Sequence, residues 1–364
     1  MEQSIETLRE ELVSLNLSIL DLFSKRARVV LDVQRLKTQE GIPTFIPERE
    51  QKMLADLVAR NRGPFPNESV RHLFKEIFRA SVALMEDSRG GSLRVSRANH
   101  KEDLIVRVGD TAIGADPIVI AGPCAVESEE QMDQVASDLS RLGIRFLRGG
   151  CFKPRSSPYS FQGMGEPGLE ILGRVARRYG MSCVTEVMDT RMVELVGNYA
   201  DILQVGARNM HNYPLLREVG RSRKPVLLKR GLAATLDEFL WAAEYIVSEG
   251  NQNVILCERG IRTFERQTRN TLDISAVPLL KQMSYLPVIV DVSHAAGRKD
   301  ILGALGRASL AAGADGLMVE VHPFPAVARS DSQQQLDAEE FSCFLSMAGL
   351  ASREVRDDTQ GAIS

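Results

Sequence analysis

The sequence lacks both a long apolar run and an excess of charge of one sign. No run approaches the roughly 20 apolar residues that a membrane-spanning helix needs, so we expect no membrane partner. The 45 basic residues are balanced by 48 acidic ones, for a net charge of −3. This balance gives no reason to expect nucleic acid as a partner. Any binding site for anions must therefore be a local cluster of basic residues rather than a property of the whole chain.

Cysteine is also scarce, and no signal peptide is visible. An odd number of scattered cysteines predicts no disulfide framework and favours a reducing compartment. The N-terminus is acidic and amphipathic, without the basic and then apolar order of a secretory signal. We therefore expect a cytoplasmic protein. The five cysteines are Cys124, Cys151, Cys183, Cys257 and Cys343.

Residues 1–88 are predicted to form a three-helix domain. Apolar residues recur every three or four positions from Leu8 to Leu36, which predicts one long helix. Shorter helices are expected over about 48–61 and 67–85. The first helix is too long for the other two to cover, which favours a dimeric bundle completed by a second copy of the chain. A solvated coiled-coil arm is the alternative.

The pattern of apolar and polar residues changes after residue 88. Residues 89–116 are expected to form a linker that ends in a short β-hairpin around Gly109, and residues 355–364 a disordered tail. Residues 117–354 alternate short apolar runs with helix-like segments, which is typical of βαβ units. Eight such runs predict an α/β fold, a (β/α)₈ TIM barrel with its chemistry at the C-terminal ends of the strands. The runs are "IVIAGPC", "RFLRGG", "CVTEV", "ILQVGAR", "VLLKRG", "VILCERG", "PVIVDVSH" and "GLMVEVH".

Each of the eight runs ends in a titratable or metal-binding side chain. In chain order these are Cys124, Arg148 and Lys153, Glu186, Arg208, Lys229, Glu258 and Arg259, His294, and Glu320 and His322. Charges that only solvate strand ends would account for one or two of them. We therefore predict that these side chains converge on one mouth of the barrel.

Six of the residues near these ends are cations, and one stretch, "LRGGCFKPRSSPYSFQG", carries three of them. Guanidinium and ammonium groups gathered at one mouth need anions to neutralise them, and they suit phosphate and carboxylate oxygens. So many cations indicate a substrate that bears both groups, or two phosphorylated substrates. Surface salt bridges are the alternative for any single cation. The six are Arg148, Lys153, Arg155, Arg208, Lys229 and Arg259.

A second group of residues favours a metal site. Cys124, His294, Glu320 and Asp331 combine a thiolate, an imidazole and two carboxylates. This donor set suits a borderline divalent ion such as Mn²⁺, Fe²⁺, Co²⁺ or Zn²⁺. A buried Cys124 that packs only as a small apolar residue is the alternative. A Lewis acid beside bound phosphates, with Lys and Glu in reach, favours carbon–carbon bond formation over hydrolysis.

These segments resemble a known family. "AGPCAVES", "QVGARNM", "PVLLKRG", "ILCERGIRTFE", "DVSHAAGR" and "MVEVHPFP" are similar to type I beta 3-deoxy-D-arabino-heptulosonate 7-phosphate (DAHP) synthase, the first enzyme of the shikimate pathway. The likeness covers nearly all of residues 117–345. The helical N-terminus resembles a chorismate mutase of the all-helical class.

The resemblance implies a role for each site residue. Arg148, Lys153, Arg208, Lys229 and Arg259 would bind phosphoenolpyruvate, and Arg155 and Ser156 would bind erythrose 4-phosphate. Cys124, His294, Glu320 and Asp331 would bind the metal, with Mn²⁺ favoured. Lys153, Glu186, Cys124 and His294 would form the catalytic set. The family usually has Thr where this chain has Ser156, which keeps the hydroxyl group.

A neighbouring family is the nearest alternative for the barrel. 3-Deoxy-D-manno-octulosonate 8-phosphate synthase condenses phosphoenolpyruvate with arabinose 5-phosphate and shares the "GPC" start. Its sugar-binding stretch usually reads Lys-Ala-Asn-Arg-Ser, where this chain has "KPRSSP". It also lacks the helical extension. The sequence therefore favours DAHP synthase.

The helical domain keeps most of the residues that its resemblance implies. The matching positions are Arg9, which would reach into the partner's site, and Arg26, Lys37, Arg49, Glu50 and Ser81. Ile46 replaces a usual carboxylate, and Met85 replaces the donor to the ether oxygen of chorismate. Losing such a donor typically costs ~2.7–4 kcal/mol of transition-state stabilisation.

Three hypotheses for the helical domain follow. It binds chorismate or prephenate for feedback with weak mutase activity, it is a full mutase in a bifunctional enzyme, or it only holds the oligomer together. The retained cations argue against the third, because assembly alone does not need them. We expect a homodimer through the helical domains or a homotetramer that also uses the barrels.

Overall fold

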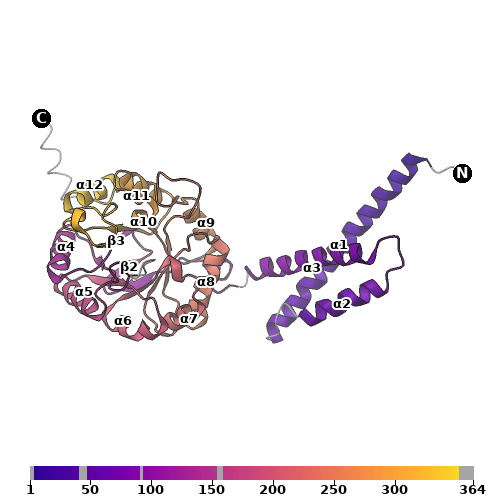
Figure 1. Cartoon of the computed structure of the whole chain (residues 1–364), viewed down its shortest axis with the longest axis horizontal. Coiled ribbons are helices and arrows are strands. Elements are labelled where there is room, and N and C mark those ends of the chain that lie inside the picture. The colour runs from indigo at the N-terminus through magenta and orange to yellow at the C-terminus, as the bar shows by residue number, and fades with distance from the viewer. Residues whose placement is uncertain (1–3, 41–46, 91–92, 154–158, 352–364) are drawn as a thin grey trace. The chain divides into compact units, whose positions relative to one another are not determined.

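The computed structural model describes residues 4–40, 47–90, 93–153 and 159–351, and the chain divides into two compact units. The first is Met1–Ser92 and the second is Leu93–Ser364. Figure 1 shows three helices in the first unit and a ring of helices around strands in the second.

The N-terminal unit consists of the three expected helices, α1 (Ile5–Glu40), α2 (Pro47–Ala59) and α3 (Asn67–Gly90). Among the described residues of this unit, the buried apolar side chains are Leu54 of α2 and Phe78 of α3. The part of α1 nearest the N-terminus extends beyond α2 and α3 (Figure 1), and its apolar side chains are exposed to solvent. These are Ile5, Leu8, Leu12, Val13, Leu15, Leu17, Ile19, Leu20, Leu22 and Phe23.

The second unit is a closed barrel of eight parallel strands, which confirms the expected TIM barrel. The barrel closes where β10 pairs with β3, with Gly316 opposite Ile118. The strands are β3 (Ile118–Gly122), β4 (Phe146–Arg148), β5 (Ser182–Glu186), β6 (Ile202–Val205), β7 (Val226–Lys229), β8 (Val254–Glu258), β9 (Val288–Asp291) and β10 (Gly316–Glu320). Their order around the barrel follows the order in the chain.

Helices cover the outside of the strands (Figure 1). They are α4 (Glu129–Arg141), α5 (Glu166–Arg178), α6 (Val193–Tyr199), α7 (Tyr213–Arg221), α8 (Leu236–Ser248), α9 (Ala276–Met283), α11 (Leu302–Ala311) and α12 (Ala338–Ala348), and the short α10 (Val292–Ala296) follows β9 directly. Side-chain caps fix several helix starts. Thr235 and Glu238 form a reciprocal capping box on α8, which satisfies backbone N–H groups that have no partner within the helix.

Strand side chains alternate between two apolar cores. In β8, Val254 and Leu256 pack in the core between strands and helices, whereas Ile255 and Cys257 point into the barrel. The hairpin β1 (Val106–Val108) and β2 (Thr111–Ile113), expected around Gly109, packs against the inward-pointing residues near the strand starts. Because the hairpin fills the N-terminal end of the barrel, the free interior lies at the C-terminal end.

All five cysteines are free thiols. Cys124, Cys151, Cys183 and Cys257 are buried free thiols, and Cys343 is an exposed one on α12. Within the described ranges, no helix combines the length and the apolar character that crossing a membrane would require. The tail over 355–364 lies outside the described residues.

Candidate active site

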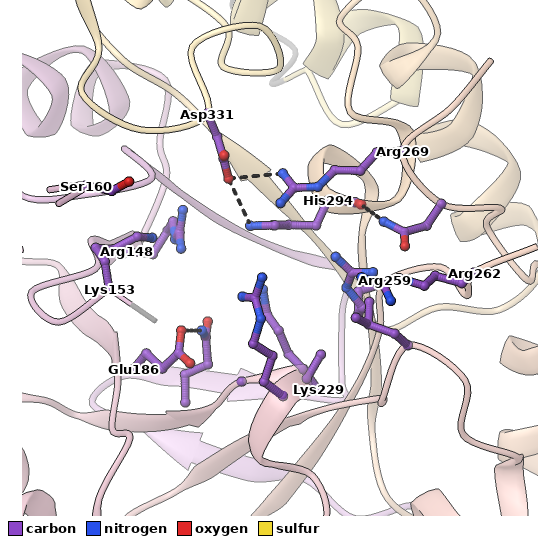
Figure 2. Close-up of a pocket in the computed structure, with 16 residues that line it drawn as sticks. Arg148, Lys153, Ser160, Glu186, Lys229, Arg259, Arg262, Arg269, His294 and Asp331 are labelled. Carbon is purple, nitrogen blue, oxygen red and sulfur yellow. Dashed lines mark hydrogen bonds and ion pairs between the residues drawn. The ribbon is translucent and has the colours of Figure 1, made fainter. Parts of the chain in front are cut away.

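The C-terminal ends of the strands surround a cavity of about 390 Å³. Its labelled side chains reach into the space from many of the strands and loops (Figure 2). The lining residues are Arg148, Lys153, Ser160, Glu186, Gln204, Gly206, Ala207, Arg208, Lys229, Leu232, Arg259, Arg262, Arg269, Asn270, His294 and Asp331.

The cavity contains seven cationic side chains. Five are the expected Arg148, Lys153, Arg208, Lys229 and Arg259. Two of the expected substrate residues, Arg155 and Ser156, lie outside the described residues.

Sequence reasoning missed Arg262 and Arg269, which also line the cavity. Both lie between β8 and α9 in "IRTFERQTRN", a stretch with no period of two or 3.6 residues. The high density of arginine in this stretch is the sequence signal that could have revealed them as cavity residues. The backbones of Ile261 and Thr271 form an antiparallel β-bridge, which keeps both ends of this stretch together at the mouth.

Several of the cations are buried and paired with carboxylates. Arg148 Nη1 lies 2.6 Å from Glu320 Oε1, and Lys229 Nζ donates a hydrogen bond to Asp291. Burial opposes the charge on Arg148, but Glu320 nearby raises the pKa of that guanidinium above its usual value. For Arg259, burial dominates and lowers the pKa. An anion bound in the cavity would stabilise this guanidinium.

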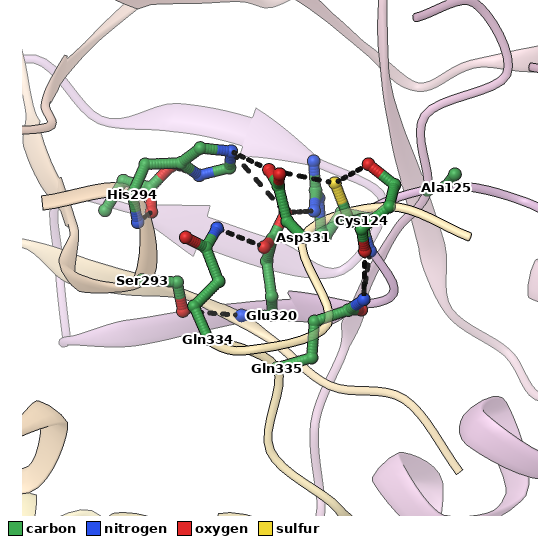
Figure 3. A network of polar contacts seen from close by, with 12 residues as sticks. Cys124, Ala125, Ser293, His294, Glu320, Asp331, Gln334 and Gln335 are labelled. Atoms are coloured by element: carbon green, nitrogen blue, oxygen red, sulfur yellow. Dashed lines mark hydrogen bonds and ion pairs between the residues drawn. The ribbon is translucent and has the colours of Figure 1, made fainter. Parts of the chain in front are cut away.

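Four expected metal ligands form one cluster at the edge of this cavity. One ligand atom from each of Cys124, His294, Glu320 and Asp331 lies within 4.8 Å of all the others. His294 Nε2 is 3.5 Å from Glu320 Oε1 and 3.9 Å from Asp331 Oδ2, and Cys124 Sγ is 3.5 Å from the same Asp331 oxygen (Figure 3). A thiol, an imidazole and two carboxylates in this arrangement fit a borderline divalent ion.

Neighbouring amides hold the cluster in place. Gln334 Nε2 donates to Glu320 Oε2 at 2.6 Å, and Gln335 Oε1 accepts from the backbone N–H of Cys124 at 2.9 Å (Figure 3). Ser293 Oγ accepts from the Glu320 backbone N–H at 2.9 Å. Such contacts orient ligand side chains before an ion binds.

Lys153 and Asp291 also touch the cluster. Lys153 Nζ donates to the Cys124 carbonyl oxygen at 2.8 Å and lies 3.2 Å from Cys124 Sγ. Asp291 Oδ2 lies 2.8 Å from Nδ1 of His294. Sequence reasoning missed Asp291, Gln334 and Gln335.

The acid–base properties of the cluster follow from its burial and its charges. Burial raises the pKa of the Cys124 thiol to about 11, and the carboxylates of Glu320 and Asp331 add to the rise. Burial would also raise the pKa of Asp331, but Arg269 and His294 lower it to about 2. A cation bound in the cluster would favour the thiolate of Cys124.

Glu186 occupies a tight position on the cavity wall. Gln204 Nε2 donates to its Oε2 at 3.3 Å. An added Cβ on Gly206 would lie 2.0 Å from Glu186 Oε1, so only glycine leaves room for this carboxylate.

Two strand-end residues do not face the mouth, which corrects the expectation that all of them converge there. Glu258 continues the outward-facing positions of β8 and pairs with Arg230 Nη1 at 2.9 Å. His322 is buried with its Nε2 3.8 Å from Glu127 Oε1. The alternation of side chains along a strand separates Glu258 from the inward-facing set.

The helical unit has a cavity of its own, of about 310 Å³. The expected Arg26, Lys37, Arg49, Glu50 and Ser81 all line it. Its other lining residues are Val29, Val30, Val33, Met53, Phe78, Val82 and Met85. The expected positions therefore gather around one mainly apolar space.

Two contacts hold Arg26 in this second cavity. Arg26 Nη1 donates to Ser81 Oγ, and the Arg26 guanidinium carbon lies 5.4 Å from the centroid of the Phe78 ring. Arg9 is not among the lining residues, since it lies near the start of α1 with its side chain 71% exposed. Ile46 lies outside the described residues.

Two protein families match the chain. Residues 95–353 match the DAHP synthetase I family, and residues 8–86 match chorismate mutase type II. These ranges correspond to the barrel unit and the helical unit.

Individual relatives agree with the first match. The phospho-2-dehydro-3-deoxyheptonate aldolase of Thermotoga maritima is 54% identical over 248 residues, which cover 68% of this chain and 73% of the relative. A crystal structure of that aldolase, also called DAHP synthase, superposes with a TM-score of 0.69 at 50% identity, covering 73% of this chain and 77% of the other. The 2-dehydro-3-deoxyphosphooctonate aldolase of Fusobacterium nucleatum is 33% identical, over 67% of this chain and 94% of that relative.

Proposed function

The chain belongs to the DAHP synthetase I family, and from this premise we propose that its barrel condenses phosphoenolpyruvate with erythrose 4-phosphate. The products are DAHP and inorganic phosphate. As a DAHP synthase, the protein is a transferase of the shikimate pathway. The observation that carries the proposal is the meeting of a cluster of cations with the four-residue ligand cluster in one mouth.

We assign the phosphoenolpyruvate site to five cavity cations, Arg148, Lys153, Arg208, Lys229 and Arg259. The substrate carries a carboxylate and a phosphate, which guanidinium and ammonium groups bind well in a buried site. Arg155 and Ser156 are proposed to bind the phosphate of erythrose 4-phosphate, on the strength of the family resemblance. Ser160, which follows that stretch, lines the same cavity.

Cys124, His294, Glu320 and Asp331 are proposed to hold a divalent ion, with Mn²⁺ favoured. Their clustered ligand atoms and mixed donor set support this assignment. Such an ion supplies a Lewis acid that polarises the aldehyde of erythrose 4-phosphate. The Nδ1 contact of His294 with Asp291 leaves its Nε2 facing the cluster.

The reaction forms one carbon–carbon bond, and at C2 it forms a carbon–oxygen bond to water and breaks the carbon–oxygen bond to phosphate. C3 of phosphoenolpyruvate attacks the aldehyde carbon, water adds at C2, and phosphate leaves from C2. We assign Lys153 to deliver a proton to the aldehyde oxygen, because its ammonium group lies beside the ligand cluster. Glu186 is proposed to accept the proton of the attacking water. Among the described carboxylates that line the cavity, it alone stands outside that cluster.

A metal-removal experiment tests the barrel chemistry. Purified chain should consume phosphoenolpyruvate and release phosphate only with erythrose 4-phosphate present. EDTA should abolish this activity and added Mn²⁺ should restore it. Arabinose 5-phosphate serves as the control substrate, and a preference for it would assign the barrel to the octulosonate branch instead. Full activity after complete metal removal would refute the role of the ligand cluster.

For the helical domain we propose feedback binding of chorismate or prephenate, with weak mutase activity. Arg26, Lys37 and Arg49 supply cations for the two carboxylates of the ligand. Met85, which lines the cavity, offers only a thioether, a weak acceptor, where mutases have a donor for the ether oxygen. The alternative is a fully bifunctional enzyme.

Chorismate disappearance distinguishes the two possibilities. The natural chain should convert chorismate slowly, and the Ile46→Asp, Met85→Gln variant should convert it faster. Prephenate should inhibit DAHP formation by the natural chain. Brisk turnover by the natural chain would establish the bifunctional enzyme. Absence of inhibition by prephenate would remove the regulatory role.

The partner and the compartment are also part of the proposal. The uncovered apolar residues of α1 support a homodimer through the helical units, in which Arg9 reaches the partner's cavity. A homotetramer would add contacts between barrels. The five free cysteines support a reducing compartment, the cytoplasm.

A further inference from the structure

Asp291 is a buried carboxylate that contacts both halves of the proposed active site. It is the last residue of β9 and is fully buried. Its Oδ2 atom accepts a hydrogen bond from Lys229 Nζ and lies 2.8 Å from His294 Nδ1. Its Oδ1 atom accepts from the His294 backbone N–H at 3.0 Å. One side chain therefore holds a cavity cation from β7 and a member of the ligand cluster after β9.

This contact decides which nitrogen of His294 carries a proton. Oδ2 of Asp291 already accepts a hydrogen bond from Lys229, so it faces Nδ1 of His294 as an acceptor. Nδ1 of His294 must therefore be the donor, which leaves the lone pair of Nε2 free. Nε2 is the atom that lies 3.5 Å from Glu320 Oε1 and 3.9 Å from Asp331 Oδ2, on the cluster side of the ring.

We propose that Asp291 is a positioning residue that joins the substrate half and the metal half of the mouth. It fixes the imidazole of His294 with Nε2 toward the ligand cluster, and it holds the ammonium of Lys229 at the cavity wall. Both side chains line the cavity (Figure 2). The inference rests on the proposed function, which assigns phosphoenolpyruvate to Lys229 and the metal to His294.

The near-isosteric variant Asp291→Asn isolates this role. An amide presents one oxygen and one NH₂ group in place of the two carboxylate oxygens. With its oxygen in the place of Oδ2, where Lys229 Nζ and His294 Nδ1 both make contact, its NH₂ group faces the backbone N–H of His294, which is also a donor. With the amide reversed, the NH₂ group faces both the ammonium of Lys229 and Nδ1, which must then accept, so the ring proton moves to Nε2. The first orientation sets two donors against each other at His294, and the second disturbs both sites.

Asp315→Asn is a matched control. Asp315 also accepts from a lysine, with Lys281 Nζ 3.0 Å from each of its oxygens, and from a backbone amide, that of Val288 at 2.7 Å. It directly precedes β10 and so lies at the opposite end of the barrel from the mouth. Its replacement tests the general effect of losing a partly buried, lysine-paired carboxylate.

Titration calorimetry of the full chain with MnCl₂, and separately with phosphoenolpyruvate, gives the decisive comparison. Asp291→Asn should weaken Mn²⁺ binding by about 10–100-fold, as is typical when a contact to a ligating histidine is lost. It should also weaken phosphoenolpyruvate binding, while Asp315→Asn leaves both affinities at the wild-type values. Wild-type affinities in Asp291→Asn, or equal losses in Asp315→Asn, would overturn the proposal. Binding requires no turnover, so a chain that made no DAHP would refute the proposed function without deciding this test.

A spectroscopic measurement on the wild-type chain does not depend on the stability of any variant. The chain has five histidines, and the side-chain ¹⁵N signals of His294 are identified by their absence in His294→Gln. In metal-free protein these signals should show a protonated Nδ1 and a bare Nε2. A proton on Nε2 in the wild type would contradict the role given to Asp291, even if Asp291→Asn did not fold.

Discussion

At the scale of single residues, Gly206 allows a direct test of Glu186. A Cβ at this position would lie 2.0 Å from Glu186 Oε1 and 2.8 Å from its carboxyl carbon, both in a side chain that can swing away. Gly206→Ala should therefore leave the fold intact and move the carboxylate. Because a displacement of about 1 Å at a reacting group can cost ~100-fold in rate, we expect a loss of that order in kcat for DAHP formation.

The control for this variant is another glycine-to-alanine change. Gly197 lies in α6, and an added Cβ would have no neighbour within 4 Å. Gly197→Ala should keep full activity and stabilise the helix by about 0.5–1 kcal/mol. Calorimetry with MnCl₂ should give wild-type affinity for both variants. Unchanged kcat in Gly206→Ala would show that Glu186 has no catalytic role.

The residues of the mouth differ in how well the sequence predicts them. Arg148, Lys229 and His294 were predicted because each follows an apolar run that reads as a strand, and strand ends meet at one mouth. Glu258 and Arg259 both follow such a run, and only the register of β8 shows which one points outward.

The orienting residues carry no comparable signal. Asp291, Gln334 and Gln335 act through hydrogen bonds to other side chains and to the backbone. Those bonds join segments far apart in the sequence, such as Cys124 and Gln335. A sequence shows the residue types but not the distances that make them partners.

At the scale of elements, the hairpin of β1 and β2 has a structural role that is separate from the chemistry. Ile113 is fully buried in the core at the strand starts, at the end opposite the mouth. Ile113→Ala should lower the free energy of unfolding by about 2–5 kcal/mol, because it leaves a cavity in a packed core. Urea denaturation followed by circular dichroism measures this change.

The chemistry should not respond to this substitution. KM for phosphoenolpyruvate in Ile113→Ala should stay at the wild-type value at a temperature where the variant is folded. Thr111→Ala, at a half-buried position of the same strand, should change stability much less. A raised KM in Ile113→Ala alone would show that the hairpin shapes the mouth.

The elements themselves were well predicted, for a physical reason. Strands of a parallel barrel are covered on both faces, so they read as short continuous apolar runs. All five residues of β8 are buried, and so are all five of β10. The segments that join strands to helices obey no such pattern. Arg262 and Arg269 were therefore missed although they lie in the same mouth.

At the scale of the whole molecule, the exposed apolar face of α1 is where we propose that a second copy of the chain binds. Leu12 is 59% exposed and Ile19 is 46% exposed, one above the other on a single helix face. An exposed apolar patch of this extent marks an interaction surface. A symmetric dimer would bury the same face of α1 in both copies.

Charges placed on this face should separate the subunits. Leu12→Glu combined with Ile19→Glu would put like charges in the interface, and sedimentation velocity should show a smaller assembly than the wild type. Ser14→Glu adds the same charge on the far side of α1 from Leu12 and Ile19, where the side chain is also exposed. This control should keep the wild-type sedimentation coefficient.

Dissociation should separate the two activities. Because Arg9 is proposed to complete the cavity of the partner subunit, the Leu12→Glu, Ile19→Glu variant should lose chorismate binding and inhibition by prephenate. DAHP formation should continue, since the described residues that line the barrel mouth belong to the barrel unit and not to α1. A variant that dissociates but still binds chorismate with wild-type affinity would show that each helical cavity is complete without its partner, and Arg9 would then have no place in the site.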